Sequence, residues 1–167
     1  TQKEIPQYSL YGEAVQDVDE RFLHVESIAE RSRLHDWSIR PHAHRDLHHL
    51  LLVQKGGGIL QVEDEEHAFR SPALIALSRS CVHGFEFRPE TDGWIVTASG
   101  ALMDRIERAY PALAPVLREP SVVRLTAANA RAAGIVFSAL VTEFRSRLLA
   151  RRVAAEALLM TIMVQTL

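Results

Sequence analysis

Histidine is concentrated in one short stretch of this chain and returns once in a later, strand-like segment. The stretch Pro-His-Ala-His-Arg-Asp-Leu-His-His puts His42 and His44 two residues apart, so on a β-strand both side chains lie on one face. His48 and His49 are adjacent and would face opposite sides, and His83 follows further along. Neutral imidazoles bind Zn, Ni, Cu and Fe. The pattern predicts a divalent transition-metal site or a polar ligand site; a cluster of hydrogen-bonded or exposed histidines is the alternative.

The segment that would position these histidines, residues 22–99, consists of short apolar stretches bounded by turn residues. Gly56–Gly58 predicts a hairpin, because glycine reaches positive φ without a Cβ clash. About eight strands at near-regular spacing, without intervening helices, predict a small β-barrel or jelly roll. The predicted strands are Phe22–Ile28, Trp37–His44, Leu47–Val53, Ile59–Glu63, His67–Phe69, Ala73–Leu77, Val82–Phe87 and Trp94–Ser99.

The sequence changes character on both sides of this segment. Before it, Pro6, Gly12 and an acidic run break any period, which predicts an irregular arm. After Gly100, apolar residues recur at helical spacing, and Thr126 is a candidate N-cap. We therefore expect a mainly β protein with a helical tail, organised as an arm over residues 1–21, a barrel over residues 22–99 and about three helices over residues 100–167.

The last stretch, Val153–Leu167, is apolar at eleven of its fifteen positions. A helix that is apolar on nearly every side needs burial on more than one of them, and the barrel can cover only one. The stretch therefore predicts a homodimer paired through this helix; burial of the helix within its own subunit is the alternative. The apolar pattern reaches Leu167 without a C-cap glycine, so we expect more of the protein to follow. The stripe expected to face the partner is Val153, Ala157, Met160, Val164 and Leu167.

Aromatic side chains and one arginine are candidates to line a ligand pocket beside the histidines. Phe85 and Phe87 share a strand face with His83, although core packing is the ordinary role of such residues. Arg40 lies two residues before His42 and would share its face, where a guanidinium binds a carboxylate bidentately; a solvated arginine at the rim is the alternative. The candidate effector-binding residues are Arg40, Trp37, Phe85, Phe87 and Trp94.

Composition is consistent with one globular domain. The chain has 167 residues, of which 47% are hydrophobic and 24% charged, enough to bury a substantial core. Its single cysteine, Cys81, excludes an internal disulfide framework, suits a reducing cytoplasm and is expected to be a small buried side chain. A net charge of -2 argues against binding a phosphate backbone without a further domain. No apolar stretch approaches the ~18 residues of a membrane span, and no signal-peptide pattern opens the chain.

The histidine spacing resembles the first motif of the cupin superfamily, in which H-x-H is followed by a glutamate and then a glycine. Here His42, His44 and Gly56 match, and His49 stands in the position of the glutamate. The second cupin motif falls on Ser78, Ser80 and His83, so its histidine is kept and its two turn residues are replaced. The resemblance implies a metal site formed by His42, His44, His49 and His83. The cupin spacing favours His49, whereas the residues alone leave open whether His48 or His49 joins the other three.

Four segments in order resemble the effector-binding domain of AraC/XylS-type transcriptional regulators, in particular those that sense small aromatic acids such as 4-hydroxybenzoate. They begin at Ile5, Arg21, Pro41 and Cys81 and read IPQYSLYGE, RFLHVESI, PHAHRDLH and CVHGFEF. The resemblance implies a cupin-type barrel that binds a small-molecule effector, helices that pair two subunits, and contact with DNA only through a C-terminal domain absent from this chain. It implies a regulator and not an enzyme.

Two other functions fit the histidines. A metal-dependent cupin enzyme, a dioxygenase or an isomerase, would use the same barrel, and a stand-alone metal-binding storage or sensor module would need no partner domain. The replacement of the motif glutamate by His49 removes the usual anionic ligand and leaves no obvious general base. That change, the missing turn residues near Ser80 and the helical tail favour the regulator.

Overall fold

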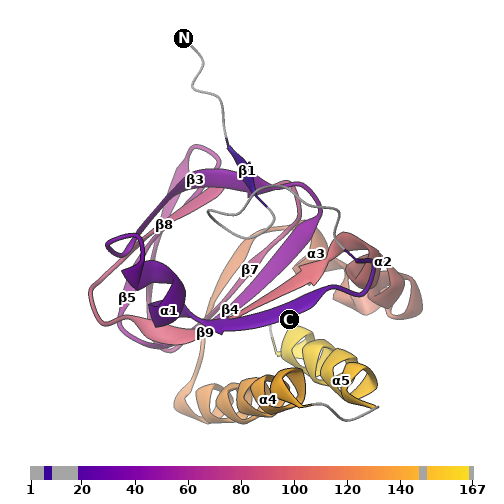
Figure 1. Cartoon of the computed structure of the whole chain (residues 1–167). Coiled ribbons are helices and arrows are strands. Elements are labelled where there is room, and N and C mark those ends of the chain that lie inside the picture. Colours follow the sequence, from indigo (N-terminus) through magenta and orange to yellow (C-terminus); the bar gives the residue numbers. More distant parts are fainter. Residues whose placement is uncertain (1–5, 9–18, 147–149, 166–167) are drawn as a thin grey trace.

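Two five-stranded β-sheets face each other and enclose an apolar interior (Figure 1). The computed structural model describes residues 6–8, 19–146 and 150–165. The first sheet has the order β1 (Gln7–Tyr8), β3 (Ser38–His44), β8 (His83–Phe87), β5 (Gly57–Val62) and β6 (Glu65–Arg70). The second has the order β10 (Ser121–Arg124), β7 (Ala73–Leu77), β4 (Leu47–Lys55), β9 (Asp92–Ser99) and β2 (Leu23–Ser27).

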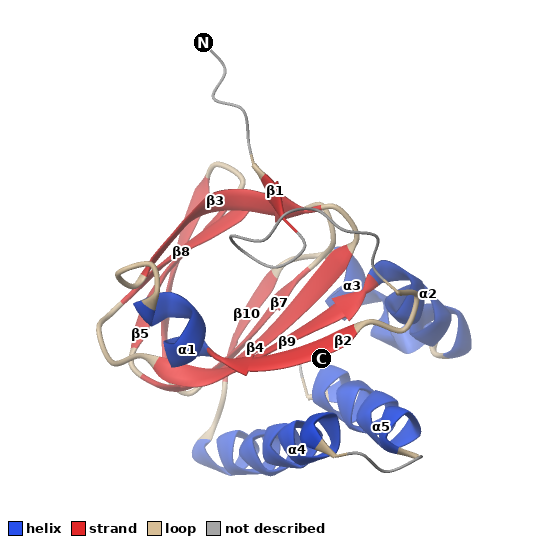
Figure 2. Ribbon diagram, in the orientation of Figure 1, coloured by secondary structure: helices blue, strands red, loops and turns tan. Residues whose placement is uncertain are grey.

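The connections confirm the predicted jelly roll of cupin type. Successive strands mostly fall in opposite sheets, and the hairpin of β5 and β6 lies within one sheet. Pairing is antiparallel throughout the described strands, except that β1 runs parallel to β3. The two sheets enclose one interior between their inner faces (Figure 2). Among the described strands no hydrogen-bonded pair joins one sheet to the other, so the predicted barrel is not closed.

The continuous apolar run of β4 reflects burial on both of its faces. Leu51 and Val53 point between the sheets, whereas Leu50 and Leu52 point outward into a second apolar cluster. That second cluster is covered by helices, so every residue of Leu47–Val53 is buried. Alternation along this strand thus assigns one set of side chains to the barrel interior and the other set to the helices.

Helices cover the outer face of the second sheet (Figure 2). These helices are α2 (Gly100–Ala109), the 3-10 turn η1 (Pro111–Leu113), α3 (Ala114–Arg118), α4 (Ala127–Arg145) and α5 (Arg151–Val164). The short helix α1 (Ile28–Arg33) packs instead on the interior cluster through Ile28. The predicted N-cap of α4 is confirmed, since the Thr126 side chain accepts a hydrogen bond from the Asn129 backbone. Phe137 of α4 and Leu159 of α5 are fully buried against this sheet. None of the helices in the described ranges is long and apolar enough to cross a membrane.

Three short elements were not foreseen, and the first is β1, which pairs with β3 inside the arm that was predicted to be irregular. The sequence predicts an uninterrupted strand to Ile28, but the Ser27 side chain caps the Glu30 backbone and the Glu30 carboxylate returns to Ser27, so β2 ends and α1 begins. The expected helical region from residue 100 onward also contains β10, which pairs with β7 and completes the second sheet. The helical tail and the barrel therefore share one sheet.

Candidate functional site

A small cavity of about 40 Å³ lies between the two sheets, with histidines on one side and aromatic rings on the other. Strands β3, β4, β8 and β9 supply most of its wall, and β2 and α1 close it. The residues lining it are Glu26, Arg31, Ile39, His42, His44, His49, Leu51, Leu77, His83, Phe85, Phe87, Ile95 and Thr97. All four histidines of the predicted site are in this set.

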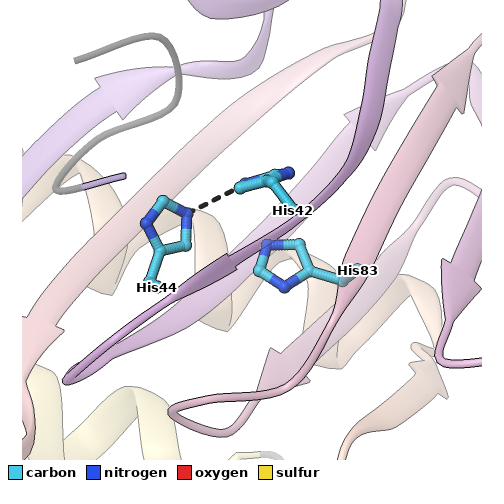
Figure 3. A group of neighbouring side chains, drawn as sticks. All are labelled: His42, His44 and His83. Atoms are coloured by element: carbon cyan, nitrogen blue, oxygen red, sulfur yellow. Dashed lines mark hydrogen bonds between the residues drawn. The ribbon is translucent and has the colours of Figure 1, made fainter. Parts of the chain in front are cut away.

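Three of these histidines present ring nitrogens to a common point. His42 and His44 are two residues apart on β3, and His83 is the partner of His42 across the β3–β8 ladder (Figure 3). One ring nitrogen from each lies within 4.8 Å of the others, and the Nε2 atoms of His42 and His44 are 3.0 Å apart. The three rings thus have the convergence that a metal ion with imidazole ligands requires.

The backbone fixes the orientation of two of these rings. His42 Nδ1 lies 2.9 Å from the carbonyl oxygen of Arg40, and His83 Nδ1 lies 3.0 Å from that of Cys81. A carbonyl oxygen only accepts, so each Nδ1 carries the proton and each Nε2 of the neutral ring is an acceptor; that of His42 accepts from His44 Nε2. This is the arrangement in which metal-bound histidines are commonly held by their outer neighbours.

His49 faces the cavity, whereas His48 faces the other way. The His49 ring lies 4.4 Å from that of His44 between centroids, and its Nδ1 is 3.0 Å from Thr97 Oγ1. Its Nε2 is buried and has no hydrogen-bond partner among the described residues. A buried polar atom without a partner is costly, so Nε2 is suited to a ligand. Alternation on β4 therefore selects His49, as the cupin spacing does.

The cavity favours neutral imidazoles. Burial, reinforced by the charges of His83 and His44, lowers the pKa of His42 to about 3. Burial, followed by His44, lowers the pKa of His83 to about 4, and burial lowers the pKa of His49 well below its ordinary value. Only neutral imidazole binds a metal, so no proton has to leave these three rings at neutral pH for an ion to bind.

The aromatic candidates divide between the cavity and other places. Phe85 and Phe87 line the cavity, with their rings stacked at a centroid distance of 4.8 Å. Trp94 faces the helices instead, because Ile95 and Thr97 occupy the inner positions of β9 and alternation sends Trp94 outward. Trp37 is half-buried at the edge of the interior cluster and lies outside the cavity wall.

Arg40 does not reach the cavity. Its side chain is exposed and borders a shallow hollow on the outer surface. The ladder between β3 and β8 shifts register between Ile39 and His42, and both of these residues face inward although they are three positions apart. Such a bulge breaks the two-residue alternation on which the placement of Arg40 beside His42 depended.

Sequence reasoning missed two charged residues that line the cavity, Glu26 and Arg31. Arg31 Nε lies 3.1 and 3.0 Å from the two carboxylate oxygens of Glu26, and an Arg31 amino nitrogen lies 2.9 Å from Oε2. Burial acts to raise the pKa of Glu26, but the neighbouring side chains of His24 and Arg31 outweigh it and hold that pKa below its ordinary value. The Ser27-x-x-Glu30 capping box, which starts α1 and so places Arg31, was the available signal.

Comparisons with solved structures return ToxT of Vibrio cholerae. A ToxT variant shares 7% identity with a TM-score of 0.48, the match covering 87% of this chain and 55% of that one. ToxT bound to (E)-4-(8-methylnaphthalen-1-yl)but-3-enoic acid shares 10% identity with a TM-score of 0.43, covering 84% of this chain and 56% of that one. This chain thus spans little more than half the length of the ToxT chains.

No curated protein sequence matches this chain. The family model of the AraC-like ligand-binding domain, in contrast, matches residues 24–162. That range includes β2 through most of α5, and with them the whole histidine cavity. The match covers far more than half of the sequence and agrees with the jelly roll and helical tail found in the structure. The chain therefore belongs to the family of AraC-like ligand-binding domains.

Proposed function

We propose that this chain is the effector-sensing and dimerisation domain of an AraC-family transcriptional regulator, and that it binds a small acid in the histidine cavity. The observation that carries the proposal is the cavity itself: His42, His44, His49 and His83 converge inside an AraC-like ligand-binding domain. DNA would be bound by a domain outside this chain. The family points to a regulatory ligand-binding domain and not to an enzyme, and Glu26, a carboxylate that lines the cavity, is held by Arg31 and so is not a ready general base.

The donor set fits a divalent transition metal, which we propose as a second component of the site. His42, His44 and His83 would hold the ion, and His49 Nε2 would provide a fourth nitrogen at the same cavity. Neutral imidazoles suit Zn, Ni, Cu or Fe(II) and leave the positive charge of the ion uncompensated. A carboxylate from the effector would supply the missing negative charge.

The size of the cavity limits the acid. Its volume of about 40 Å³ has room for a carboxylate or a few waters, whereas pockets for drug-sized ligands start at roughly 300 Å³. An aromatic ring would pack against Phe85 and Phe87 only if the wall formed by Glu26 and Arg31 moves outward. The proposed effector is therefore a short-chain acid or a compact aromatic acid.

The proposal predicts that acids stabilise the domain without being consumed. Thermal unfolding would be followed with acetate, benzoate and 4-hydroxybenzoate, each with and without added Zn²⁺, and with benzamide as the uncharged control. A hundredfold excess over Kd stabilises the native state by about 2.7 kcal/mol, so the midpoint rises with acid concentration. Failure of every acid to raise the midpoint contradicts the proposal, and consumption of an acid with Fe(II) would favour the cupin dioxygenase or isomerase.

Dimerisation is proposed through the exposed stripe of α5. One side of this helix packs against its own subunit through Leu159 and Ile162, both fully buried. The opposite side exposes Val153 at 72% and Val164 at 59% of their surfaces, with exposed Ala157 between them and Met160 half-buried. Leu167, the last member of the predicted stripe, lies outside the described residues. A second copy of this helix is the apolar partner that two-fold symmetry provides.

Replacing Val153 and Val164 together with glutamate is expected to give a folded monomer. Both side chains are mostly exposed within the subunit, so the change places charge at the proposed interface and leaves the core intact. Light scattering would report the mass, and circular dichroism would check the fold. Ile135→Glu is the matched control, because Ile135 is 71% exposed on α4 and outside the stripe. A wild-type domain that is monomeric at micromolar concentration would refute this interface.

A further inference from the structure

The ion pair between Glu26 and Arg31 closes one side of the histidine cavity. Both side chains line the cavity, and their side chains are only 16% and 13% exposed. The contact is bidentate, with three nitrogen–oxygen distances of 2.9–3.1 Å. A guanidinium forms this forked contact with one carboxylate at a time along a given edge. An acid in the cavity therefore meets an arginine whose carboxylate-binding edge is occupied by a carboxylate of the protein itself.

We infer that Arg31 is the residue that recognises the carboxylate of the effector, and that Glu26 is an internal competitor which holds Arg31 until the acid replaces it. The inference rests on the proposed function, since it requires an acid to enter the cavity. It assigns to Arg31 the role that the sequence pattern suggests for Arg40, whose side chain is on the outer surface. The exchange also moves two side chains in the wall of a cavity whose volume of about 40 Å³ is too small for an aromatic ring.

The elements that carry the pair are suited to such an exchange. Arg31 stands on α1, a helix of six residues fixed at its start by the Ser27–Glu30 capping box and by fully buried Ile28. Glu26 stands on β2, at the edge of the second sheet. The anchored start of α1 holds Arg31 next to the cavity, while its contact with Glu26 is made by side chains alone. Side-chain rearrangement can thus switch the partner of Arg31 without unfolding either element.

The far side of Glu26 leads toward the proposed dimerisation helices. His24 Nε2 lies 3.8 Å from Glu26 Oε2, and the His24 ring meets that of Phe144 edge-on at a centroid distance of 5.5 Å. Phe144 belongs to α4, which packs against α5. When Arg31 turns to the acid, Glu26 loses its arginine partner and stays beside His24, whose ring contacts Phe144, so the rearrangement reaches a side chain of α4. Acid binding is therefore coupled to α4 through His24.

Two substitutions test the competition, because they should act in opposite directions. Benzoate binding would be measured by isothermal titration calorimetry on the whole domain, with benzamide as the uncharged control. Arg31→Gln removes the donor and is expected to weaken benzoate at least tenfold, whereas Glu26→Gln removes the competing charge and is expected to tighten it several-fold. Arg33→Gln is the matched control: it lies on the same helix, is exposed and contacts Trp37, and should bind as wild type does.

A purely structural role for the pair predicts weaker binding in both variants, and that result would overturn the inference. Two further variants keep the test decisive if a single variant does not fold. Arg31→Lys keeps the positive charge but cannot form the forked contact with a carboxylate, and the double variant Glu26→Gln/Arg31→Gln removes both charges of the pair. Unchanged benzoate affinity in Arg31→Gln overturns the inference while leaving the proposed function in place. Binding of no acid by wild type or by Glu26→Gln overturns both.

The coupling has a separate readout in hydrogen exchange. Benzoate should change the protection of amides in α4 in the wild-type domain, and Phe144→Leu should abolish that change while benzoate affinity is kept. An equal response of α4 in Phe144→Leu would exclude the path through His24 and Phe144.

Discussion

Lowering the pH from 7 to 5 is expected to reduce the unfolding free energy of the metal-free domain by several kcal/mol. Burial lowers the pKa of His42 to about 3 and that of His83 to about 4, and it lowers the pKa of His49 well below its ordinary value. Burial, followed by the charge of Arg79, also lowers the pKa of His48 to about 4. All four rings are thus harder to protonate in the folded protein than in the unfolded chain.

Acid destabilises the domain because the unfolded chain binds more protons than the folded protein does. Below the unfolded value of 6.5, the unfolded chain takes up protons that the folded cavity excludes, so acid favours unfolding. The stabilising contribution is complete above pH 6.5 and is lost as the pH falls through the window between 6.5 and the folded values of about 4 and 3. Each such histidine contributes a slope of about 1.4 kcal/mol per pH unit inside that window.

Urea unfolding followed by circular dichroism at pH 7, 6 and 5 would measure this loss. His48→Asn removes one titrating group, so it should lower the slope of the unfolding free energy against pH by the share of one histidine. The cavity should stay unaltered, because His48 faces away from it. His67→Asn is the control, since His67 is an exposed residue of β6. An unfolding free energy that stays constant from pH 7 to pH 5 would contradict the buried, neutral state of these rings.

Spacing together with the cupin resemblance predicted which histidines lie close together, because the relevant side chains obey strand alternation. H-x-H on β3 puts His42 and His44 on one face, and antiparallel pairing brings His83 opposite. The same rule separates His49 from His48 on β4, and applied to β9 it would have placed Trp94 on the helix side. Where a regular strand carries the residue, sequence was sufficient.

The missed residues depend on features with little local signal. Arg40 was misplaced by a bulge, and a register shift is created by the pairing of two distant strands and not by the residues around it. Arg31 reaches the cavity from a helix of six residues, too short for a 3.6-residue period to be detected. Strand β10 has four residues after a proline-rich stretch, and it is formed by pairing with the edge of β7.

Zinc is expected to stabilise the domain through His42, His44 and His83, and loss of any one of them is expected to lower metal affinity by more than about 100-fold. Loss of an outer-sphere partner typically lowers affinity by 10–100-fold, so removal of a nitrogen that holds the ion directly should exceed that range. The ring nitrogens of these three residues already lie within 4.8 Å of one another, and little rearrangement is needed. At a thousandfold excess of free Zn²⁺ over Kd, the wild-type domain gains about 4 kcal/mol.

Calorimetric titration with Zn²⁺ and thermal unfolding with and without it would measure this for His42→Ala, His44→Ala and His83→Ala. His49→Ala should lose less affinity, because His49 lies outside the group of three that shares the 4.8 Å limit. His48→Ala is the matched control: it removes a buried imidazole next to His49 from the opposite face of β4, so it should destabilise the fold and leave zinc affinity unchanged. If His48→Ala and His83→Ala reduce zinc affinity equally, or wild type shows no zinc-dependent stabilisation, the cavity binds the acid through imidazole hydrogen bonds and Arg31 without a metal.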